Sequence, residues 1–574
     1  MSNRRLDRMK YIGHKVVDRT KDSFFNFTHA HLIRNMVTAS ELDLVKRESC
    51  DQDLVSIAFY PTGGFGDYII SSKLLDELLL SVPCRIDVYC ENVVFGQAIY
   101  GARPGVRVLH YDSMYGNRML YDVVLRVEHF IHVLNWNAHH VAKICPEFAD
   151  TISALGKSMK NIRPEINQQW FREAMHFKRC RILGVNRWTE LRHGSIFQIP
   201  DQYTYIDLKT RYLDRMQELH LDHCRYITVN RGADSMGRST MQTKVWPQEY
   251  YETLLVLFKK KYPDIRVVQL GTANNTKISG ADCYVLGESM EVTKWVLRGS
   301  MLHIDCEGGL VHLAVQMAVT CVVLFGPTPM HMYAYPVNIN LVSRKCSNCM
   351  GTHPDWAFAC YQGWKEPACM KDLTADDVMA HIEKYMDERS RRKEKDIIKI
   401  DAGLQKPIGP QKPIGNFESE NSGIHAGAQT QTDLSGIYER CRKRNQQLTM
   451  QERHSGLYAE VLKQAAGSSR PMKAAVVNAG RDYIGWYLTE MGCEVTEFDR
   501  SYGYSGETGD TSFNRFTKCC IGYGMDMRLG DACNLPYAPE SFDLVVQFAD
   551  AAADEVSDRE VKRILKDGGI WIFG

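Results

Sequence analysis

The sequence predicts an α/β protein with two consecutive parallel-sheet domains and a third, smaller domain of the same class. Apolar runs of strand length alternate with helical stretches in two series between about residues 54 and 385. A charged and proline-containing segment then interrupts the pattern, and a new apolar strand begins near Lys473. The 574 residues are enough for three or four domains, at roughly 150 residues each.

Each predicted strand is a short run rich in β-branched and aromatic residues, followed by a helical stretch. Alternation of this kind is typical of parallel sheets joined by crossover helices. The weaker pattern between about 130 and 224 is expected to hold the end of the first unit and the connection. The predicted strands are 54–60, 85–89, 106–110 and 121–127 in the first unit, and 226–230, 265–270, 301–304 and 321–325 in the second.

The domain boundaries follow from shifts in composition. Residues 1–50 are polar and weakly patterned and are taken as an N-terminal extension, 51–224 as the first domain and 225–387 as the second. The stretch 388–436 carries a charge run and the tandem repeat Gln-Lys-Pro-Ile-Gly, which predict a linker. Residues 437–466 are expected to be helical, and 472–574 to form the small third domain.

Composition narrows the class of protein without identifying it. A net charge of +1 gives no bulk electrostatic case for binding nucleic acid. The basic N-terminus leads into no signal-like apolar run and no 18 apolar residues stand together, so we expect a cytoplasmic protein, at most peripheral to a membrane. In such a protein the 18 cysteines are read mostly as reduced thiols, and a clustered set becomes a metal candidate.

The most informative stretch is 303–326, a strand, helix and second strand with Glu307, Gly308 and Gly309 at the start of the helix. The glycines let a ligand approach the backbone, and the unpaired N–H groups and helix dipole favour a diphosphate there. His312 is placed in the first turns of this helix. The stretch therefore predicts a nucleotide-binding loop.

Two further segments carry candidate groups. In the turn after the first strand, Gly64 and Gly66 leave the backbone open and Asp67 is available as a general base, although it could equally be a plain helix cap. In the second domain, Thr243 and Lys244 precede a Trp-Pro pair, and a lysine anchored in this way can reach a phosphate. Taken alone, an exposed surface lysine is the simpler interpretation.

Together these segments resemble glycosyltransferase family 9, whose best-known members are ADP-heptose heptosyltransferases. The resemblance rests on Gly63-Gly-Phe-Gly-Asp67, Thr243-Lys-Val-Trp-Pro247, Glu307-Gly-Gly-Leu-Val-His312 and Phe325-Gly-Pro-Thr328, in order, from about Leu54 to Tyr385. It implies a GT-B fold, with two Rossmann-like domains facing a cleft. It also implies inverting transfer of a sugar, a heptose in the best-known members, from an ADP-sugar to a saccharide or protein hydroxyl.

The resemblance assigns roles to the candidate residues. Asp67 would be the base, Thr243 and Lys244 would hold the donor phosphates, and Glu307 to His312 would line the diphosphate site. Many members of the family have Asp-Ser-Gly or Asp-Thr-Gly where this chain has Glu-Gly-Gly. The donor class is therefore implied more firmly than the donor sugar.

Four cysteines, Cys346, Cys349, Cys360 and Cys369, fall in a segment rich in glycine, proline and tryptophan. Four thiolates at this spacing suit tetrahedral zinc or iron. The alternatives are two labile disulfides or four unrelated thiols. Cysteine-containing tails at this position are similar to those of protein heptosyltransferases, so we expect a structural metal that fixes the loop after Thr328.

The C-terminal segment resembles a class I S-adenosylmethionine-dependent methyltransferase. In that resemblance Asp499, at the end of the second strand, would bind the cofactor ribose and Asp531 would lie on its adenine side. The usual glycine-rich loop is replaced by Ala479-Gly-Arg-Asp-Tyr-Ile-Gly485, and the sequence ends before the last two strands of that fold, which predicts an exposed sheet edge. A structural or partner-binding domain is therefore favoured over an active methyltransferase.

The sequence leaves two classes of function open. One is a glycosyltransferase, with or without a second methyltransferase activity. The other is a different use of the same fold, as a nucleotide-sugar epimerase or a binding scaffold. Asp67 separates them, because a transferase needs a base at that position.

Overall fold

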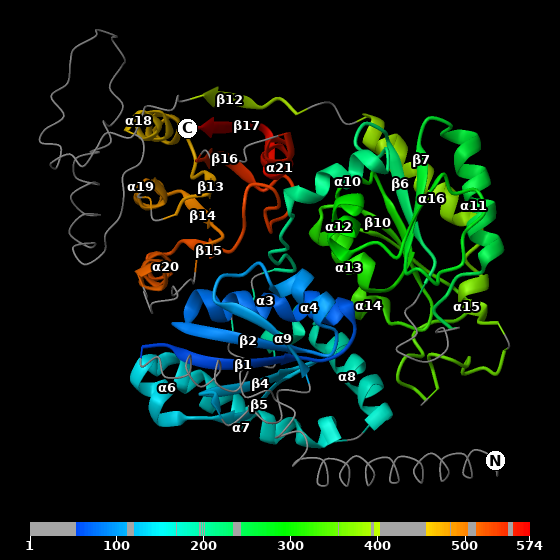
Figure 1. Cartoon of the computed structure of the whole chain (residues 1–574), viewed down its shortest axis with the longest axis horizontal. Helices are drawn as coiled ribbons and strands as arrows, with labels where there is room; N and C mark the ends of the chain where they lie inside the picture. The colour runs from blue at the N-terminus through cyan, green and yellow to red at the C-terminus, as the bar shows by residue number, and fades with distance from the viewer. Residues whose placement is uncertain are drawn as a thin grey trace, which may run out of the picture.

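The computed structural model describes residues 53–574 apart from 112–119, 168, 194–196, 198, 200, 233–242, 354, 365, 392–394, 402–454, 481, 483, 503–511 and 549–554. It contains three sheets, one for each predicted domain (Figure 1). The N-terminal extension 1–50, most of the predicted linker and the first part of the predicted helix 437–466 lie outside the described residues. No helix in the described ranges is long and apolar enough to cross a bilayer.

The first domain has a five-stranded sheet in the order β3-β2-β1-β4-β5. The four predicted strands are confirmed and are parallel, while β5 was not predicted and runs antiparallel to β4. The strands are β1 Val55–Pro61, β2 Cys84–Cys90, β3 Val106–His110, β4 Val123–Val127 and β5 Ile131–Trp136, and the helices are α3 Phe65–Ser81, α4 Val93–Tyr100, α6 Ala138–Ile144, α7 Pro146–Asn167, α8 Gln169–Leu183 and α9 Glu190–His193.

The second domain has a six-stranded parallel sheet in the order β11-β10-β9-β6-β7-β8. Again the four predicted strands are present, and two short ones, β8 and β11, were not predicted. The strands are β6 Tyr226–Asn230, β7 Arg266–Gly271, β8 Cys283–Leu286, β9 His303–Cys306, β10 Cys321–Phe325 and β11 Ile339–Val342. The helices, including those of the connection, are η3 Thr210–Tyr212, α10 Leu213–Glu218, α11 Gln248–Lys261, α12 Met290–Gly299, α13 Gly309–Gln316, α14 Met330–Tyr333, α15 Ala368–Lys371 and α16 Ala375–Arg391.

The third domain has a parallel sheet in the order β12-β17-β16-β13-β14-β15. Its elements are β12 Ile398–Asp401, α18 Ser455–Ala466, β13 Lys473–Val477, α19 Ile484–Glu490, β14 Glu494–Phe498, α20 Ser512–Gly522, β15 Asp526–Arg528, β16 Phe542–Gln547, α21 Glu555–Ile564 and β17 Leu565–Phe573.

The predicted linker and the predicted exposed edge both need correction. Residues 388–391 continue α16, and 398–401 form β12, which pairs in parallel with β17 along Ile570 to Phe573. The edge of β17 is therefore covered by a strand from the segment between the domains. The physical reason is that unpaired strand N–H and C=O groups gain hydrogen bonds from an added strand.

Candidate functional site

The two glycine turns predicted from sequence meet at the junction of the first two domains, in direct contact. A Cβ placed on Gly66 would lie 2.4 Å from the His312 ring, and one on Gly309 would lie 2.9 Å from the Phe65 ring. Only glycine fits at either position, since both neighbours are packed rings. The N-terminus of α3 therefore lies against the N-terminus of α13.

The turn at Glu307 to Gly309, which leads into α13, has the features of an anion site. α13 begins at Gly309 after Gly308, which offers no side-chain cap, so its first N–H groups are left for a ligand. The predicted helix and the position of His312 within it are confirmed.

Glu307 and Lys244 form an ion pair at this turn, with 2.5 Å between Glu307 Oε2 and Lys244 Nζ. His312 Nε2 lies 3.7 Å from the other carboxylate oxygen. Burial alone would raise the pKa of Glu307, but Lys244 and His312 outweigh it and lower that pKa to about 2. The predicted phosphate lysine and the predicted acidic loop are thus brought together.

Thr243 does not face this site. Its hydroxyl donates to the carbonyl oxygens of Trp356 and Ala357, at 2.9 and 3.0 Å, inside the four-cysteine segment. Trp246 is fully buried with its indole N–H on Leu373 O at 2.7 Å, which confirms the predicted anchor. Thr243 therefore connects Lys244 to the cysteine segment instead of presenting its hydroxyl to a phosphate.

Asp67 lies on the first turn of α3, on the other side of the junction. Its Oδ2 accepts the N–H of Gly64, the N-cap residue, at 2.9 Å. Through this oxygen Asp67 helps to cap the start of α3. Its Oδ1 accepts Arg187 Nη2 at 2.8 Å, and the side chain is one-third exposed. An ionised carboxylate held at both oxygens and still open to solvent can accept a proton from a substrate hydroxyl.

Sequence reasoning missed three residues at this junction. Arg187 and Glu190 come from the weakly patterned stretch before the connection, and Tyr333 from α14. Tyr333 is buried, and burial, together with the nearby carboxylates of Asp67, Glu307 and Glu190, raises its pKa well above the usual value, against the lowering effect of Arg187. Only the Arg187/Glu190 spacing of three gives any local signal, and it is a common helical ion-pair spacing.

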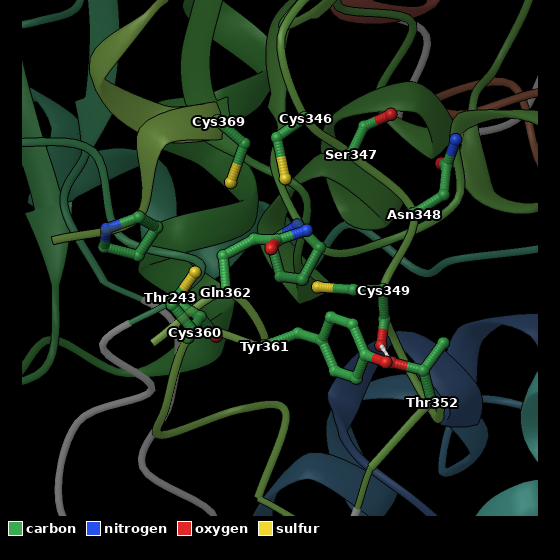
Figure 2. A pocket seen from close by; sticks show the side chains of 12 residues that line it. Thr243, Cys346, Ser347, Asn348, Cys349, Thr352, Cys360, Tyr361, Gln362 and Cys369 are labelled. Atoms are coloured by element: carbon green, nitrogen blue, oxygen red, sulfur yellow. Dashed lines mark hydrogen bonds between the residues drawn. The ribbon is translucent and has the colours of Figure 1, made fainter. Parts of the chain in front are cut away.

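The four predicted cysteines line one cavity of about 300 Å³, together with Thr243 and Pro327. Figure 2 shows their sulfur atoms turned toward a common centre. Burial and the neighbouring thiols raise the pKa of Cys349 to about 11 and of Cys369 to about 12. Because no basic group contributes to either pKa, a bound cation would supply the charge that four thiolates need.

The cysteine segment is also tied to the second domain. Asn348 N–H donates to Gly326 O at 3.3 Å and Met350 N–H to Pro327 O at 2.9 Å. A Cβ on Gly326 would meet Met370 Sδ at 2.5 Å. These contacts place the segment against the loop after β10, where the sequence predicted that a structural metal would hold it.

In the third domain the two predicted cofactor carboxylates, Asp499 and Asp531, follow the neighbouring strands β14 and β15. A cavity of about 370 Å³ is lined by Asp531 and Arg500 of this domain and by 207–211 of the interdomain connection. Asp499 accepts Gly480 N–H at 2.7 Å and Ser501 N–H at 2.8 Å. Asp531 accepts the Tyr205 hydroxyl at 2.8 Å. Both carboxylates thus already accept hydrogen bonds from protein donors, and an adenosine moiety would have to share them.

Comparison with known proteins gives one family match and several similar solved structures. Residues 479–573 match the family described as "Methyltransferase domain". No curated protein sequence matches the chain. This family match agrees with the resemblance of the C-terminal segment.

Three solved structures similar to residues of the first two domains are bacterial glycosyltransferases. They are the iron-containing dodecameric glycosyltransferase TibC from enterotoxigenic E. coli H10407 (13% identity, 59% of this chain and 81% of that chain, TM-score 0.40), the E. coli ADP-heptose heptosyltransferase II (12%, 58% and 99%, 0.36) and a glycosyltransferase family 9 protein from Veillonella parvula DSM 2008 (14%, 59% and 99%, 0.38).

Proposed function

We propose that the chain is an inverting glycosyltransferase that uses a nucleoside diphosphate sugar, with ADP-heptose as the first donor to test. The observation that carries this proposal is the contact between the Asp67 turn and the uncapped N-terminus of α13, with Lys244 beside it. A base and an anion site from two different domains are brought together at one junction. A binding scaffold has no need of this base.

The proposed reaction follows from the charges at the junction. Asp67 takes the proton of the acceptor hydroxyl as its oxygen forms a bond to the anomeric carbon of the donor. The bond from that carbon to the diphosphate breaks, and the nucleoside diphosphate leaves with the electron pair. The first N–H groups of α13 and Lys244 stabilise the charge that builds on the leaving group. Attack opposite the leaving group inverts the anomeric centre.

The four cysteines are proposed to hold one structural zinc or iron ion. A site closed by four thiolates has no open position for a substrate, so the metal would act by fixing the segment. Thr243 contacts this segment, and Lys244 is the next residue along the chain, so the ion would help to place the lysine side chain.

The third domain is proposed to act chiefly as a structural brace. Asp531, its predicted adenine-side carboxylate, accepts a hydrogen bond from the Tyr205 hydroxyl. This bond helps to hold the third domain against the interdomain connection. The acceptor is proposed to be a saccharide or a protein hydroxyl, in the cytoplasm. No nucleic acid partner is proposed, because the net charge is +1.

The function is tested by incubating the protein with a panel of sugar nucleotides and measuring release of the nucleoside diphosphate. Asp67→Asn is then expected to lower the turnover rate at least about 100-fold, because a general base contributes about 10² to 10⁴. ADP affinity should be unchanged in calorimetry, since Asp67 does not contact the anion site. Asp150→Asn, an exposed carboxylate on α7, is the control. Unchanged transfer by Asp67→Asn would sink the assignment.

A further inference from the structure

A buried cluster of charged side chains lies directly behind Asp67. Glu190, with only 2% of its side chain exposed, accepts His129 Nδ1 at 3.0 Å and His176 Nε2 at 2.8 Å. Its Oε1 also accepts Nη1 of Arg187, which is itself 2% exposed. We call Glu190, His129, His176 and Arg187 the Glu190 cluster. The proposed transfer reaction uses none of them directly.

Arg187 connects this cluster to both sides of the junction. Its Nη2 donates to Asp67 Oδ1 at 2.8 Å, and its backbone N–H donates to Met332 O of the second domain at 2.8 Å. The neighbouring Trp188 ring packs on the His312 ring, with centroids 5.5 Å apart. The guanidinium is therefore held between Glu190 and Asp67, while α14 and the packing of Trp188 hold the backbone that carries it.

A metal ion is the alternative occupant of the cluster, because the ligand atoms of His129, His176 and Glu190 lie within 4.8 Å of one another. A divalent cation at that point would sit beside the Arg187 guanidinium, which already holds one oxygen of the shared carboxylate. Two positive centres around one buried carboxylate repel each other strongly. The geometry therefore favours a hydrogen-bonded cluster over a metal site.

The charges in the cluster are consistent with this interpretation. Burial would raise the pKa of Glu190, but Arg187 and His129 outweigh it and lower that pKa to about 2. Burial would lower the pKa of His129, but Glu190 outweighs it and raises that pKa. The carboxylate thus stays ionised and can hold the guanidinium in place.

We propose that Arg187 is the positioning residue of the Asp67 carboxylate, and that Glu190, His129 and His176 exist to hold Arg187. The proposal rests on the function proposed above, in which Asp67 is the base. Arg187 occupies one lone pair of Oδ1 and the Gly64 N–H one of Oδ2, so the carboxylate cannot rotate and keeps its free lone pairs toward the substrate side.

The first experiment compares Arg187→Gln and Arg187→Lys with Arg192→Gln, a change at an exposed arginine on the short helix α9. Arg187→Gln is expected to lower kcat about 10- to 100-fold with ADP affinity within twofold of wild type, as for other supporting residues of active sites. The pH–rate profile should differ from that of wild type, because a charged group in contact with the base is lost. Arg187→Lys should restore part of both effects, and Arg192→Gln should change neither.

The pH profile has to be interpreted with the other charged groups around Asp67 and Arg187. These are Glu190 and His129 in the cluster, Tyr333 on α14, and Glu307, His312 and Lys244 at the donor turn. The control Glu190→Gln leaves the donor turn intact and should reproduce the shift. A folded Arg187→Gln protein with wild-type kcat and pH profile would overturn the proposal.

A second measurement needs no turnover. Melting temperatures of Asp67→Asn, Arg187→Gln and the double variant form a double-mutant cycle. The double variant should be less destabilised than the sum of the single variants, because they remove the same interaction. If no sugar nucleotide is turned over but the cycle is non-additive, the proposed function fails while the pairing of Arg187 with Asp67 stands. Additive shifts in melting temperature would overturn the proposed role of Arg187. A metal ion that is lost in His176→Ala would overturn the proposed role of the Glu190 cluster.

Discussion

At the scale of single residues, the ion pair between Lys244 and Glu307 fixes the charged side chains at the turn that leads into α13. Both side chains are mostly buried, and Glu307 Oε2 is 2.5 Å from Lys244 Nζ. The glutamate stands where the resembled family has an aspartate, and its longer side chain reaches the lysine. A diphosphate bound at α13 would approach a lysine that is already oriented and charged, so little side-chain entropy is lost on binding.

Lys244→Ala should weaken ADP binding by about 10- to 150-fold, the equivalent of a charged hydrogen bond of about 1.5 to 3 kcal/mol. The loss should shrink at high salt, because it is electrostatic. Calorimetric titration of ADP at two salt concentrations measures both effects. Lys260→Ala, an exposed lysine on α11, is the matched control. Equal ADP affinity of Lys244→Ala and wild type would remove Lys244 from the phosphate site.

The sequence predicted part of this junction and missed part. Asp67, Lys244 and the Glu307 to His312 turn stand at strand ends and helix starts, where local pattern shows which groups are exposed to a ligand. Arg187, Glu190 and Tyr333 do not follow such a pattern. Their importance depends on contacts across more than a hundred residues, as between Arg187 and Asp67, and no local signal reports those contacts.

At the scale of elements, β12 shows how a segment between domains becomes part of a sheet. The residues Ile397, Ile398 and Ile400 alternate partly with polar ones, which is a strand pattern inside a charged region. Lys399 Nζ lies 3.9 Å from the centroid of the buried Trp571 ring, and the strand pairs with β17. The pattern was available from sequence, but the open edge that it covers belongs to a strand 170 residues later.

The four-cysteine segment is the second element that carries a prediction. Purified protein should contain about one zinc or iron ion per chain, because four thiols share one cavity, and burial makes Cys349 and Cys369 costly to ionise without a cation. The double variant Cys349→Ser/Cys360→Ser should lose the ion and melt at a lower temperature. Elemental analysis and calorimetry measure these effects.

The matched control for the metal is Cys519→Ser, because Cys519 is an exposed free cysteine on α20, far from this cavity in sequence. It should keep the ion and the wild-type melting temperature. Metal-free wild-type protein purified under reducing conditions would contradict the metal prediction. It would leave the glycosyltransferase proposal standing, since no step of the transfer uses the ion.

At the scale of the whole molecule, the third domain contacts both of the others (Figure 1). Arg528 pairs with Asp201 at 2.6 Å, and Asp201 also pairs with Lys73 of α3 at 2.5 Å. Toward the second domain, Arg298 pairs with Glu560 of α21. Since the domain is attached on both sides of the junction, it restrains how far the first two domains can move apart.

The ion pair between Glu560 and Arg298 is expected to weaken in acid. Burial would raise the pKa of Glu560, but Arg298 and Arg563 outweigh it and lower that pKa to about 2. Because the folded pKa lies below the unfolded value near 4.3, the stabilisation is complete at neutral pH and is lost as the pH falls from about 4.5 toward 2. The shift corresponds to about 3 kcal/mol.

Glu560→Gln should therefore lower the free energy of unfolding at pH 7 by a few kcal/mol, of the order of a broken buried ion pair. The difference from wild type should narrow between pH 4.5 and 3. Denaturant unfolding at these three pH values measures it, and Glu555→Gln, at the exposed start of α21, is the control. A difference that does not depend on pH would rule out this pair as the source.

The sequence alone determined most strands of three largely parallel sheets and the main candidate groups of the first two domains, because strand and helix patterns and the residues at their ends are local properties. Only the tertiary structure decided that the Asp67 and Glu307 turns touch, that Thr243 faces the cysteine segment, that Arg187 holds Asp67 and that β12 covers β17. Each of these is a contact between segments far apart in the chain. Such contacts depend on how whole domains pack, and no short stretch of sequence records that packing.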